Sequence, residues 1–371
     1  MTEGEAWLAL NAAELPPRTV LALVDHYGSA ASVIAAGAAV RDVARLTEHE
    51  AIRLSAAARR DYQREFGRLK QSGVRLVTIR DAEYPANLRQ IYDPPPVLFV
   101  RGSFMPCDER AVAIVGTRRV TPYGRLVTET LARELAQRQV TVVSGMAVGA
   151  DAAAHRGALS AGGRTIGVLA CGVDVPYPRD TMELREQAVE RGAVMSEVPP
   201  GTGARPGRFT ARNRLISGLA LGVVVTEAPE QSGALITANT AANQGRQVFA
   251  VPGSVNSEFS RGTHALLRDG ARLVESVDDI LAELALPEAA PIAPKPTPAA
   301  TQEVAREAPP ASDLTPDETV ILDALSLQQR HVDQIIEDCR VPANRASASL
   351  LMLELKGLVR RLPGNMFMRV R

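Results

Sequence analysis

Two adjacent arginines follow a glycine where a short apolar run gives way to helix-forming residues. The run Ala111–Val115 leads directly into Gly116-Thr117-Arg118-Arg119, called here the Gly-Thr-Arg-Arg loop, and Thr121-Pro122 then supplies residue types that begin a helix. Free N–H groups and the helix dipole at such a turn favour an anion, and arginines add charge-assisted bonds. The loop is therefore predicted to bind phosphate. The alternative is a structural turn with solvated arginines.

The Gly-Thr-Arg-Arg loop lacks the motifs that mark nucleotide cofactors. It carries neither the Gly-x-Gly-x-x-Gly dinucleotide fingerprint nor a Walker A lysine. We therefore expect no NAD, ATP or other cofactor. The three cysteines, Cys107, Cys171 and Cys339, lie far apart and show no metal-ligand spacing, so no metal is expected either.

Cysteine usage and hydropathy indicate the compartment. An odd and sparse cysteine count fits a reducing cytoplasm. The first residues include Glu3 and Glu5 and lack the basic start and long apolar run of a signal peptide. Since no stretch of about 18 uninterrupted apolar residues occurs, we predict a cytoplasmic protein without a membrane span.

A second group of arginines lies in a segment without acidic residues. That segment contains Arg205, Arg208, Phe209, Arg212 and Arg214. An aromatic ring among arginines is typical of surfaces that bind single-stranded nucleic acid, because bases stack on the ring while arginines follow the backbone. A solvated basic loop with a buried ring explains the composition equally well. The whole chain has 42 basic and 42 acidic residues, so nucleic-acid binding would have to use a local patch.

One further pair of residues has the spacing of a chemical site. Asp151 and His155 are four residues apart, on one face of a predicted helix. They would suit a metal or an acid–base pair. Because no third ligand or nucleophile is near in the sequence, we instead expect a capping and packing pair.

The elements that would position these residues alternate between strands and helices from Val74 onward. Short, nearly continuous apolar runs separated by helical stretches predict an α/β fold with a Rossmann-like, doubly wound parallel sheet. The predicted strands are 76–79, 97–100, 112–115, 140–143, 165–169, 193–196, 223–226, 248–251 and 272–274. The predicted helices include 123–138, 150–160, 182–191 and 235–243.

Different patterns flank this region and predict further domains. Residues 1–74 read as an N-terminal helical domain, similar to helix-hairpin-helix or sterile-alpha-motif pieces. The Rossmann-like domain would cover 75–286, and a Pro/Ala-rich linker would cover 287–312. Residues 313–371 read as helix, helix, turn, helix and a two-stranded end around Pro363-Gly364-Asn365, the order of a winged helix.

The segment from about Tyr84 to Ala271 resembles the DprA family of DNA-processing proteins, also called Smf. Many ordered motifs agree, and the flanking domains fit the family's variable ends. The matching residues are Tyr84-Pro85, Leu88, Asp93, Pro95-Pro96, Val112 through Arg119, Tyr123-Gly124, Ser144 through Ala147, Asp151, His155, Tyr177-Pro178, Ser196-Glu197, Phe209 through Gly218, Ser232 through Ala238 and Val251-Pro252-Gly253.

The resemblance implies a function and a set of contacts. It implies a protein, not an enzyme, that binds and protects single-stranded DNA, helps to load the RecA recombinase during natural transformation, and forms a homodimer through its Rossmann-like domain. By motif, the Gly-Thr-Arg-Arg loop would bind phosphate, Arg179 would contact DNA, and Phe209, Arg212 and Asn213 would contact the strand. With the arginine-rich segment, the predicted DNA-binding residues are Gly116, Thr117, Arg118, Arg119, Arg179, Arg205, Arg208, Phe209, Arg212, Asn213 and Arg214.

Two positions depart from the family pattern. Thr210 stands where the family often has proline, and His264 stands where it usually has asparagine. Both departures concern local loop shape and leave the expected fold unchanged.

Two other functions stay open. The fold resembles that of phosphoribohydrolases, which cleave nucleoside monophosphates, but the catalytic glutamate is missing from the corresponding stretch at 231–239; Glu197 and Glu227 remain candidate acids. A transcription regulator would bind duplex DNA through the winged helix. Its predicted recognition helix, 342–356, is not strongly basic, which favours the single-strand hypothesis.

Overall fold

The computed structural model describes residues 1–286, 314–326, 329–362 and 365–370. The chain divides into two compact units. The larger unit holds the described residues up to 286 apart from Thr121–Tyr123, and the smaller unit holds those three together with the described residues from 314 on. The predicted linker at 287–312 lies outside the described residues.

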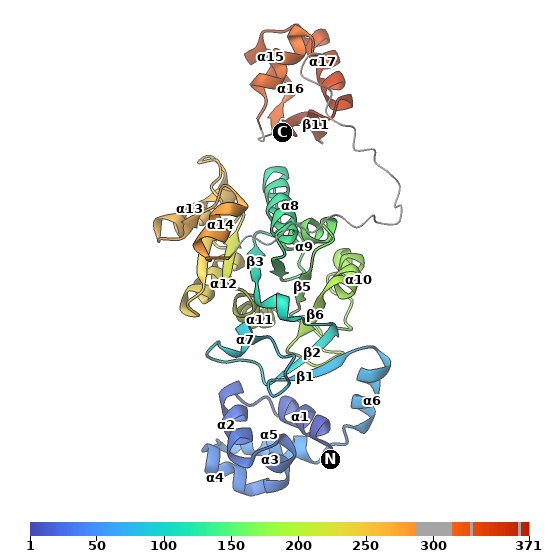
Figure 1. The fold of residues 1–371 in the computed structure, drawn as a ribbon, viewed down its shortest axis with the longest axis vertical. Helices are drawn as coiled ribbons and strands as arrows, with labels where there is room; N and C mark the ends of the chain where they lie inside the picture. Colours follow the sequence, from blue (N-terminus) through green and yellow to red (C-terminus); the bar gives the residue numbers. More distant parts are fainter. Residues whose placement is uncertain (287–313, 327–328, 363–364, 371) are drawn as a thin grey trace. The chain divides into compact units, whose positions relative to one another are not determined.

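Six short helices form the N-terminal part of the larger unit, in agreement with the helical pattern of residues 1–74 (Figure 1). Helix α1 (Glu3–Ala12) is central to this bundle, and its Trp7 is only 2% exposed. The bundle shares its apolar core with the neighbouring sheet through Val97 and Phe99. The other helices are α2 (Pro17–Tyr27), α3 (Ala30–Ala36), α4 (Val40–Ala44), α5 (Glu48–Ala58) and α6 (Gln63–Gln71).

No single helix in the described part of the chain is long and apolar enough to cross a membrane. Among the described residues, one pair of helical stretches, Pro17–Tyr27 and Ala30–Ala44, is together long and apolar enough, but the two are bent by 88° relative to each other.

All nine predicted strands are present and form one sheet in the order β1-β2-β6-β5-β4-β3-β7-β8-β9. The strands from β6 to β9 in that order pair in parallel, which confirms the doubly wound sheet. The edge differs, because β1 pairs antiparallel with β2, and β2 with β6. Between β1 and β2 the chain forms only the four-residue helix α7 (Ala86–Arg89), whereas parallel connections use a full crossover helix. The strands are β1 (Arg75–Thr78), β2 (Val97–Gly102), β3 (Ala111–Val115), β4 (Thr141–Ser144), β5 (Thr165–Val168), β6 (Ala193–Ser196), β7 (Gly222–Val225), β8 (Gln247–Ala250) and β9 (Arg272–Leu273).

Helices cover both faces of the sheet, because buried parallel strands present apolar side chains on both sides. In β3, Val112 and Ile114 pack into one layer, and Ala113 and Val115 pack into the other. The first layer contains α8 (Pro122–Gln137), α9 (Ala150–Ser160) and α14 (Val277–Glu283), with α10 (Met182–Arg191) beside α9. The second layer contains α7, α11 (Pro206–Leu219), α12 (Gly233–Asn243) and α13 (Arg261–Arg268). Short 3-10 helices occupy Gly37–Ala39, Pro106–Glu109, Arg179–Thr181 and Glu258–Ser260.

The strand order reverses at β3, which has β4 on one side and β7 on the other. After β3 the chain continues into α8 in the first layer, and after β7 it continues into α12 in the second. The two connecting loops therefore diverge at the carboxyl ends of β3 and β7. Such a switch point leaves a crevice that binds ligands in doubly wound folds.

The arginine-rich segment folds as helix α11, so its interpretation as a basic loop is wrong. Pro206 occupies the first turn, where its missing N–H costs nothing. The last two turns are buried on nearly all sides, and at Gly218 a Cβ atom would lie 2.9 Å from Leu88 and from Ile91. A helix that is buried all round has no apolar stripe of period 3.6, so its sequence gives no amphipathic signal.

The smaller unit is the predicted winged helix. Its three helices share a core that includes Ile321, Ile335 and Leu350. Thr315 and Glu318 form the capping box of the first helix, where the sequence predicts a helix start. The strand β10 (Arg330–His331) was not predicted, because two residues are too few to show an alternating pattern. The other elements are α15 (Pro316–Ala324), α16 (Val332–Cys339), α17 (Ala343–Leu355), β11 (Val359–Leu362) and β12 (Met366–Arg369), and Pro363-Gly364 of the predicted turn lie outside the described residues.

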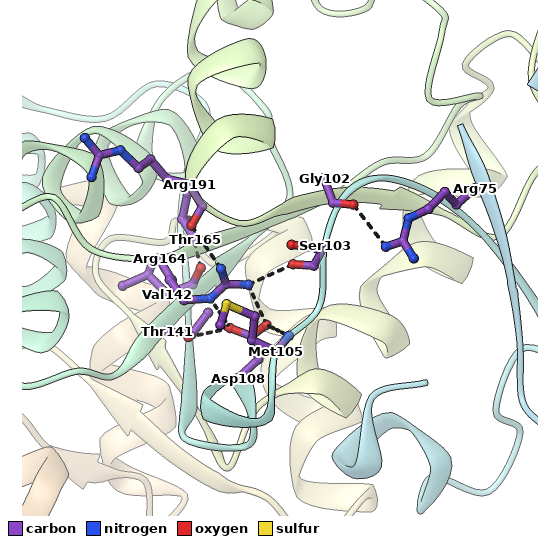
Figure 2. A network of polar contacts seen from close by, with 10 residues as sticks. All are labelled: Arg75, Gly102, Ser103, Met105, Asp108, Thr141, Val142, Arg164, Thr165 and Arg191. Carbon is purple, nitrogen blue, oxygen red and sulfur yellow. Dashed lines mark hydrogen bonds and ion pairs between the residues drawn. The ribbon is translucent and has the colours of Figure 1, made fainter. Parts of the chain in front are cut away.

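An ionic network around Asp108 and Arg164 fixes the amino ends of β4 and β5 (Figure 2). The crevice lies at the other, carboxyl end of these strands. The Arg164 guanidinium donates to both carboxylate oxygens of Asp108 at 2.8 Å. It also donates to the carbonyl oxygens of Ser103 at 2.8 Å and of Arg191 at 3.3 Å. Thr141 donates its hydroxyl to Asp108 at 2.8 Å. Because Asp108 is 7% exposed, removal of Arg164 would leave a buried carboxylate without its cation.

The variant Arg164→Ala is expected to lower the free energy of unfolding by about 2–4 kcal/mol, since a buried charge that loses its partner is costly. Denaturant titration followed by circular dichroism measures this change. Arg101→Ala is the matched control: it removes an ion pair to Glu186 whose side chains are 25% and 49% exposed, and it should cost less than about 1 kcal/mol. Equal losses in the two variants would contradict the role of Arg164.

Candidate nucleic-acid interface

A pocket of about 380 Å³ occupies the switch-point crevice. Its walls come from the loop after β3, the start of α9, helix α11, and the loop between β7 and α12. The lining residues are Val115, Gly116, Thr117, Arg118, Ala147, Asp151, Phe209, Arg212, Asn213, Ile216, Pro229, Gln231, Ser232, Gly233, Ala234 and Thr237.

Backbone hydrogen bonds hold the Gly-Thr-Arg-Arg loop in this pocket. The Thr117 N–H donates to the Glu227 carbonyl at 2.8 Å, and the Ala150 N–H donates to the Thr117 carbonyl at 3.1 Å. A Cβ atom on Gly116 would lie 2.7 Å from the Ala150 methyl, so only glycine allows the strand end and α9 to pack this closely. Thr117 is buried while Arg118 is exposed, which leaves the arginine side chain available to a ligand.

Arg118 lies over the Phe209 ring at the rim of the pocket, and Tyr177 meets the same ring edge-on; these three side chains are called here the stack. The guanidinium carbon of Arg118 lies 4.8 Å from the centre of the Phe209 ring. The Tyr177 ring meets the Phe209 ring at a centroid distance of 6.0 Å and an interplanar angle of 61°. A cation beside two aromatic faces can bind a phosphate and the adjacent base together.

Arg212 lies beneath this stack and is 7% exposed. Its guanidinium donates to the Gly145 carbonyl at 2.6 Å and to the Val168 carbonyl. Gly145 is required here, because a Cβ atom would overlap the guanidinium and the Asp151 carboxylate. Burial raises the pKa of Asp151, and the positive charge of Arg212 opposes that shift. Arg212 therefore shapes the floor of the pocket by holding the ends of β4 and β5.

Asp151 and His155 pack in the interior, as expected for a structural pair. Asp151 accepts a hydrogen bond from the Ala147 N–H at 3.3 Å. The Nδ1 atom of His155 lies 2.7 Å from the Thr165 hydroxyl. Burial and the nearby Arg212 charge lower the pKa of His155 to about 3, so its ring is neutral at ordinary pH. Within the described residues, no group of three or more His, Cys, Asp or Glu side chains could hold a metal ion.

Six of the predicted DNA-binding residues line the pocket, and five lie elsewhere. Those that line it are Gly116, Thr117, Arg118, Phe209, Arg212 and Asn213. Arg119 is exposed and lies 5.9 Å from the Phe259 ring centre, and Arg208 donates to the Gly203 carbonyl at 2.5 Å. Arg214 forms ion pairs with Glu197 at 2.5 Å and Asp93 at 3.2 Å. The other two, Arg179 and Arg205, are exposed.

Sequence reasoning missed the residues that the loop after β7 contributes, which include Gln231 and Ser232. Ser232 caps helix α12 by accepting a hydrogen bond from the Ala234 N–H at 3.2 Å, so the positive end of that helix dipole points at the pocket. The signal was a second strand-to-helix turn with an N-cap serine. Its position beside the Gly-Thr-Arg-Arg loop follows only from the strand order.

The chain is similar to proteins of known families. The model of the DNA recombination-mediator protein A family matches residues 75–285, and that of the DprA winged helix domain matches residues 305–365. The chain is 41% identical over 216 residues to the DNA processing protein DprA of Bacillus subtilis, which covers 58% of this chain and 73% of that protein. It is 32% identical over 377 residues to protein Smf of Escherichia coli, which covers 100% and 97%. The resemblance seen in the sequence is thereby confirmed.

Two solved structures are also similar. The X-ray structure of DNA processing protein A from Streptococcus pneumoniae matches with a TM-score of 0.67 and 33% identity over 76% of this chain and 98% of that chain. A structure of DNA processing protein A from Helicobacter pylori, described for its single-stranded DNA binding mode, matches with a TM-score of 0.52 and 32% identity over 58% and 97%.

The buried His155 predicts a pH dependence of stability. Its pKa is lower in the folded chain than the ordinary value of 6.5, so below pH 6.5 the unfolded chain binds the extra proton. The stabilisation is complete above pH 6.5 and is lost as the pH falls toward 3. The titration of His155 should lower the free energy of unfolding by about 2 kcal/mol between pH 7 and pH 5.

The variant His155→Gln removes this titration. Denaturant titrations at pH 7 and pH 5 give the change in the free energy of unfolding with pH for the variant and for the unchanged chain. The carboxylates titrate in both proteins, so their contribution cancels when the two changes are compared. Identical slopes in the two proteins would show that His155 is not held neutral.

Proposed function

Because the chain belongs to the DNA recombination-mediator protein A family, we propose that it binds single-stranded DNA in the switch-point crevice. In this proposal it is a cytoplasmic protein without catalytic activity that protects incoming DNA and mediates loading of the RecA recombinase in natural transformation and recombination. The family resemblance supports the RecA and transformation parts. The geometry of the crevice supports the DNA-binding part.

The observation that carries the proposal is the placement of Arg118 over Phe209 at the mouth of the pocket. The guanidinium supplies a charge for a phosphate, and the rings of Phe209 and Tyr177 supply faces for a base. The similar structure from Helicobacter pylori, which concerns a single-stranded DNA binding mode, supports the same ligand class for this chain.

The alternative of a phosphoribohydrolase is not favoured by the positions of the candidate acids. Glu197 accepts two hydrogen bonds from Arg214, at 2.5 and 2.6 Å. Glu227 is 3% exposed and packs against Gly124. Neither is among the residues that line the pocket, so we propose that the crevice binds its ligand without cleaving it.

A homodimer is part of the proposal, and one edge of the larger unit offers a surface for it. Leu273 lies in the edge strand β9 and is 48% exposed, and Val255, in the loop after the adjacent strand β8, is 82% exposed. An open strand edge with exposed apolar side chains is suited to pairing with a second copy.

Variants of the stack should separate charge from stacking. Arg118→Ala should weaken binding of oligo-dT on the order of tenfold near 0.1 M salt and lower the salt slope by about 0.7, because one phosphate contact is lost. Phe209→Ala should lower the binding free energy for oligo-dT by about 1–3 kcal/mol. Its salt slope should stay unchanged, because the lost stacking contact involves no charge. Fluorescence anisotropy at several salt concentrations measures both quantities.

Arg156→Ala is the matched control for Arg118→Ala. Arg156 is exposed on α9 and does not line the pocket, so its removal should leave affinity and salt slope unchanged. If Arg118→Ala and Phe209→Ala both bind oligo-dT as tightly as the unchanged chain at every salt concentration, the crevice is not the DNA site.

The double variant Val255→Glu/Leu273→Glu should shift the dimer toward the monomer, because it places charges on the proposed apolar surface. Size-exclusion chromatography with light scattering measures the mass. Arg268→Glu, on the exposed side of α13, is the charge control. A dimer that survives the double variant would place the interface elsewhere, and a monomeric unchanged chain would exclude the homodimer.

A further inference from the structure

We propose that the N-terminal helical bundle holds a second contact for the same DNA strand, in a groove beside helix α6. This inference rests on the proposed function, because it assigns the groove to phosphates of a strand already bound in the crevice. The groove has a volume of about 630 Å³ and is separate from the crevice pocket.

The positive side of the groove comes from three arginines. Arg64 and Arg68 lie on α6, and Arg60 lies just before it; all three are exposed and line the groove. Arg64 and Arg68 are four residues apart, so they stand on one helix face about 6 Å apart along the axis. Successive phosphates of an extended single strand have a similar separation.

The groove also contains three carboxylates, and each is bonded to a group other than Arg64 or Arg68. Glu65 pairs with Arg60 at 2.9 Å. Asp61 accepts a hydrogen bond from the Gln63 N–H at 2.9 Å, and Asp174 accepts one from the Gly201 N–H at 2.8 Å.

Arg64 and Arg68 differ from their neighbour Arg60. Within the part of the chain that the structure describes, neither makes an ion pair. Two exposed guanidinium groups on one face therefore have no carboxylate that satisfies them, which suits an external anion.

Two loops connect this groove to the crevice. The residues 171–178 contribute Cys171 and Tyr177 to the small pocket beside Phe209, and Asp174 to the α6 groove. The second loop contributes Pro200 and Gly201 to the groove.

Hydrogen bonds join these loops into one ridge. The Gly172 N–H donates to the Thr202 carbonyl at 2.8 Å, and Gly201 donates to Asp174. Exposed arginines follow each loop, Arg179 after the first and Arg205 after the second. In the proposed path, a strand that leaves the stack of Phe209 and Tyr177 along this ridge reaches Arg64 and Arg68 on α6. The ligand class is thus a polyphosphate backbone that is long enough to span both sites.

The length of the oligonucleotide tests this path. Arg64→Ala/Arg68→Ala should leave the affinity for oligo-dT of about 6 nucleotides unchanged, because such a strand occupies only the crevice. For oligo-dT of about 20 nucleotides the same variant should bind on the order of tenfold more weakly near 0.1 M salt, and its salt slope should fall by about 1.4. Arg64→Lys/Arg68→Lys retains the charges and should restore most of the affinity.

A matched control removes two charges from the same bundle. Arg41→Ala/Arg45→Asn changes two exposed arginines, and asparagine tolerates the φ of 51° at position 45. It should bind both oligonucleotides like the unchanged chain. If Arg64→Ala/Arg68→Ala also binds the long oligonucleotide normally, the α6 groove is not on the path. If Arg118→Ala binds both oligonucleotides as tightly as the unchanged chain does, the crevice is not the primary DNA site. The proposed path from the crevice to the α6 groove then fails as well.

Discussion

The buried guanidinium of Arg212 is the contact on which the candidate site depends. It joins α11 to Gly145 after β4 and to Val168 at the end of β5. A charge removed from water costs several kcal/mol unless hydrogen bonds and an opposite charge compensate it, and here two carbonyls and the nearby Asp151 do so. Since Phe209 lies one turn before Arg212 on the same helix, the contact also fixes the ring that meets Arg118.

The arginines of this chain have separate roles that their number does not reveal. Arg164 and Arg212 are held by carboxylates or carbonyls of the chain, and Arg214 is held by Glu197 and Asp93. Arg118 is exposed at the mouth of the crevice. An arginine that is satisfied by the protein stabilises the fold, whereas an exposed one over an aromatic ring is available to an anion. The distinction depends on tertiary contacts, so composition alone cannot make it.

The sequence was most informative where the physics is local. The strands of the sheet are buried on both faces, so runs such as Val112–Val115 appear as continuous apolar segments, and helix α9 was predicted with its observed bounds. Helix α11 was not recognised, because its buried residues include Arg212 and Asn213 and therefore break the apolar pattern. The antiparallel edge made by β1 and β2 likewise depends on pairing partners far along the chain.

The sequence predicts individual segments of the candidate site but not which segments lie next to one another. The Gly-Thr-Arg-Arg loop could be found from a strand-to-helix turn, whereas the loop with Ser232 joins it only because β7 lies next to β3 in the sheet. That adjacency also bears on the kind of ligand. The stack of Arg118 and Phe209 separates the main pocket from a second, smaller one, and both pockets include these two side chains. A ligand that uses both must pass across the stack, as a chain of bases and phosphates does and a single enclosed nucleotide does not.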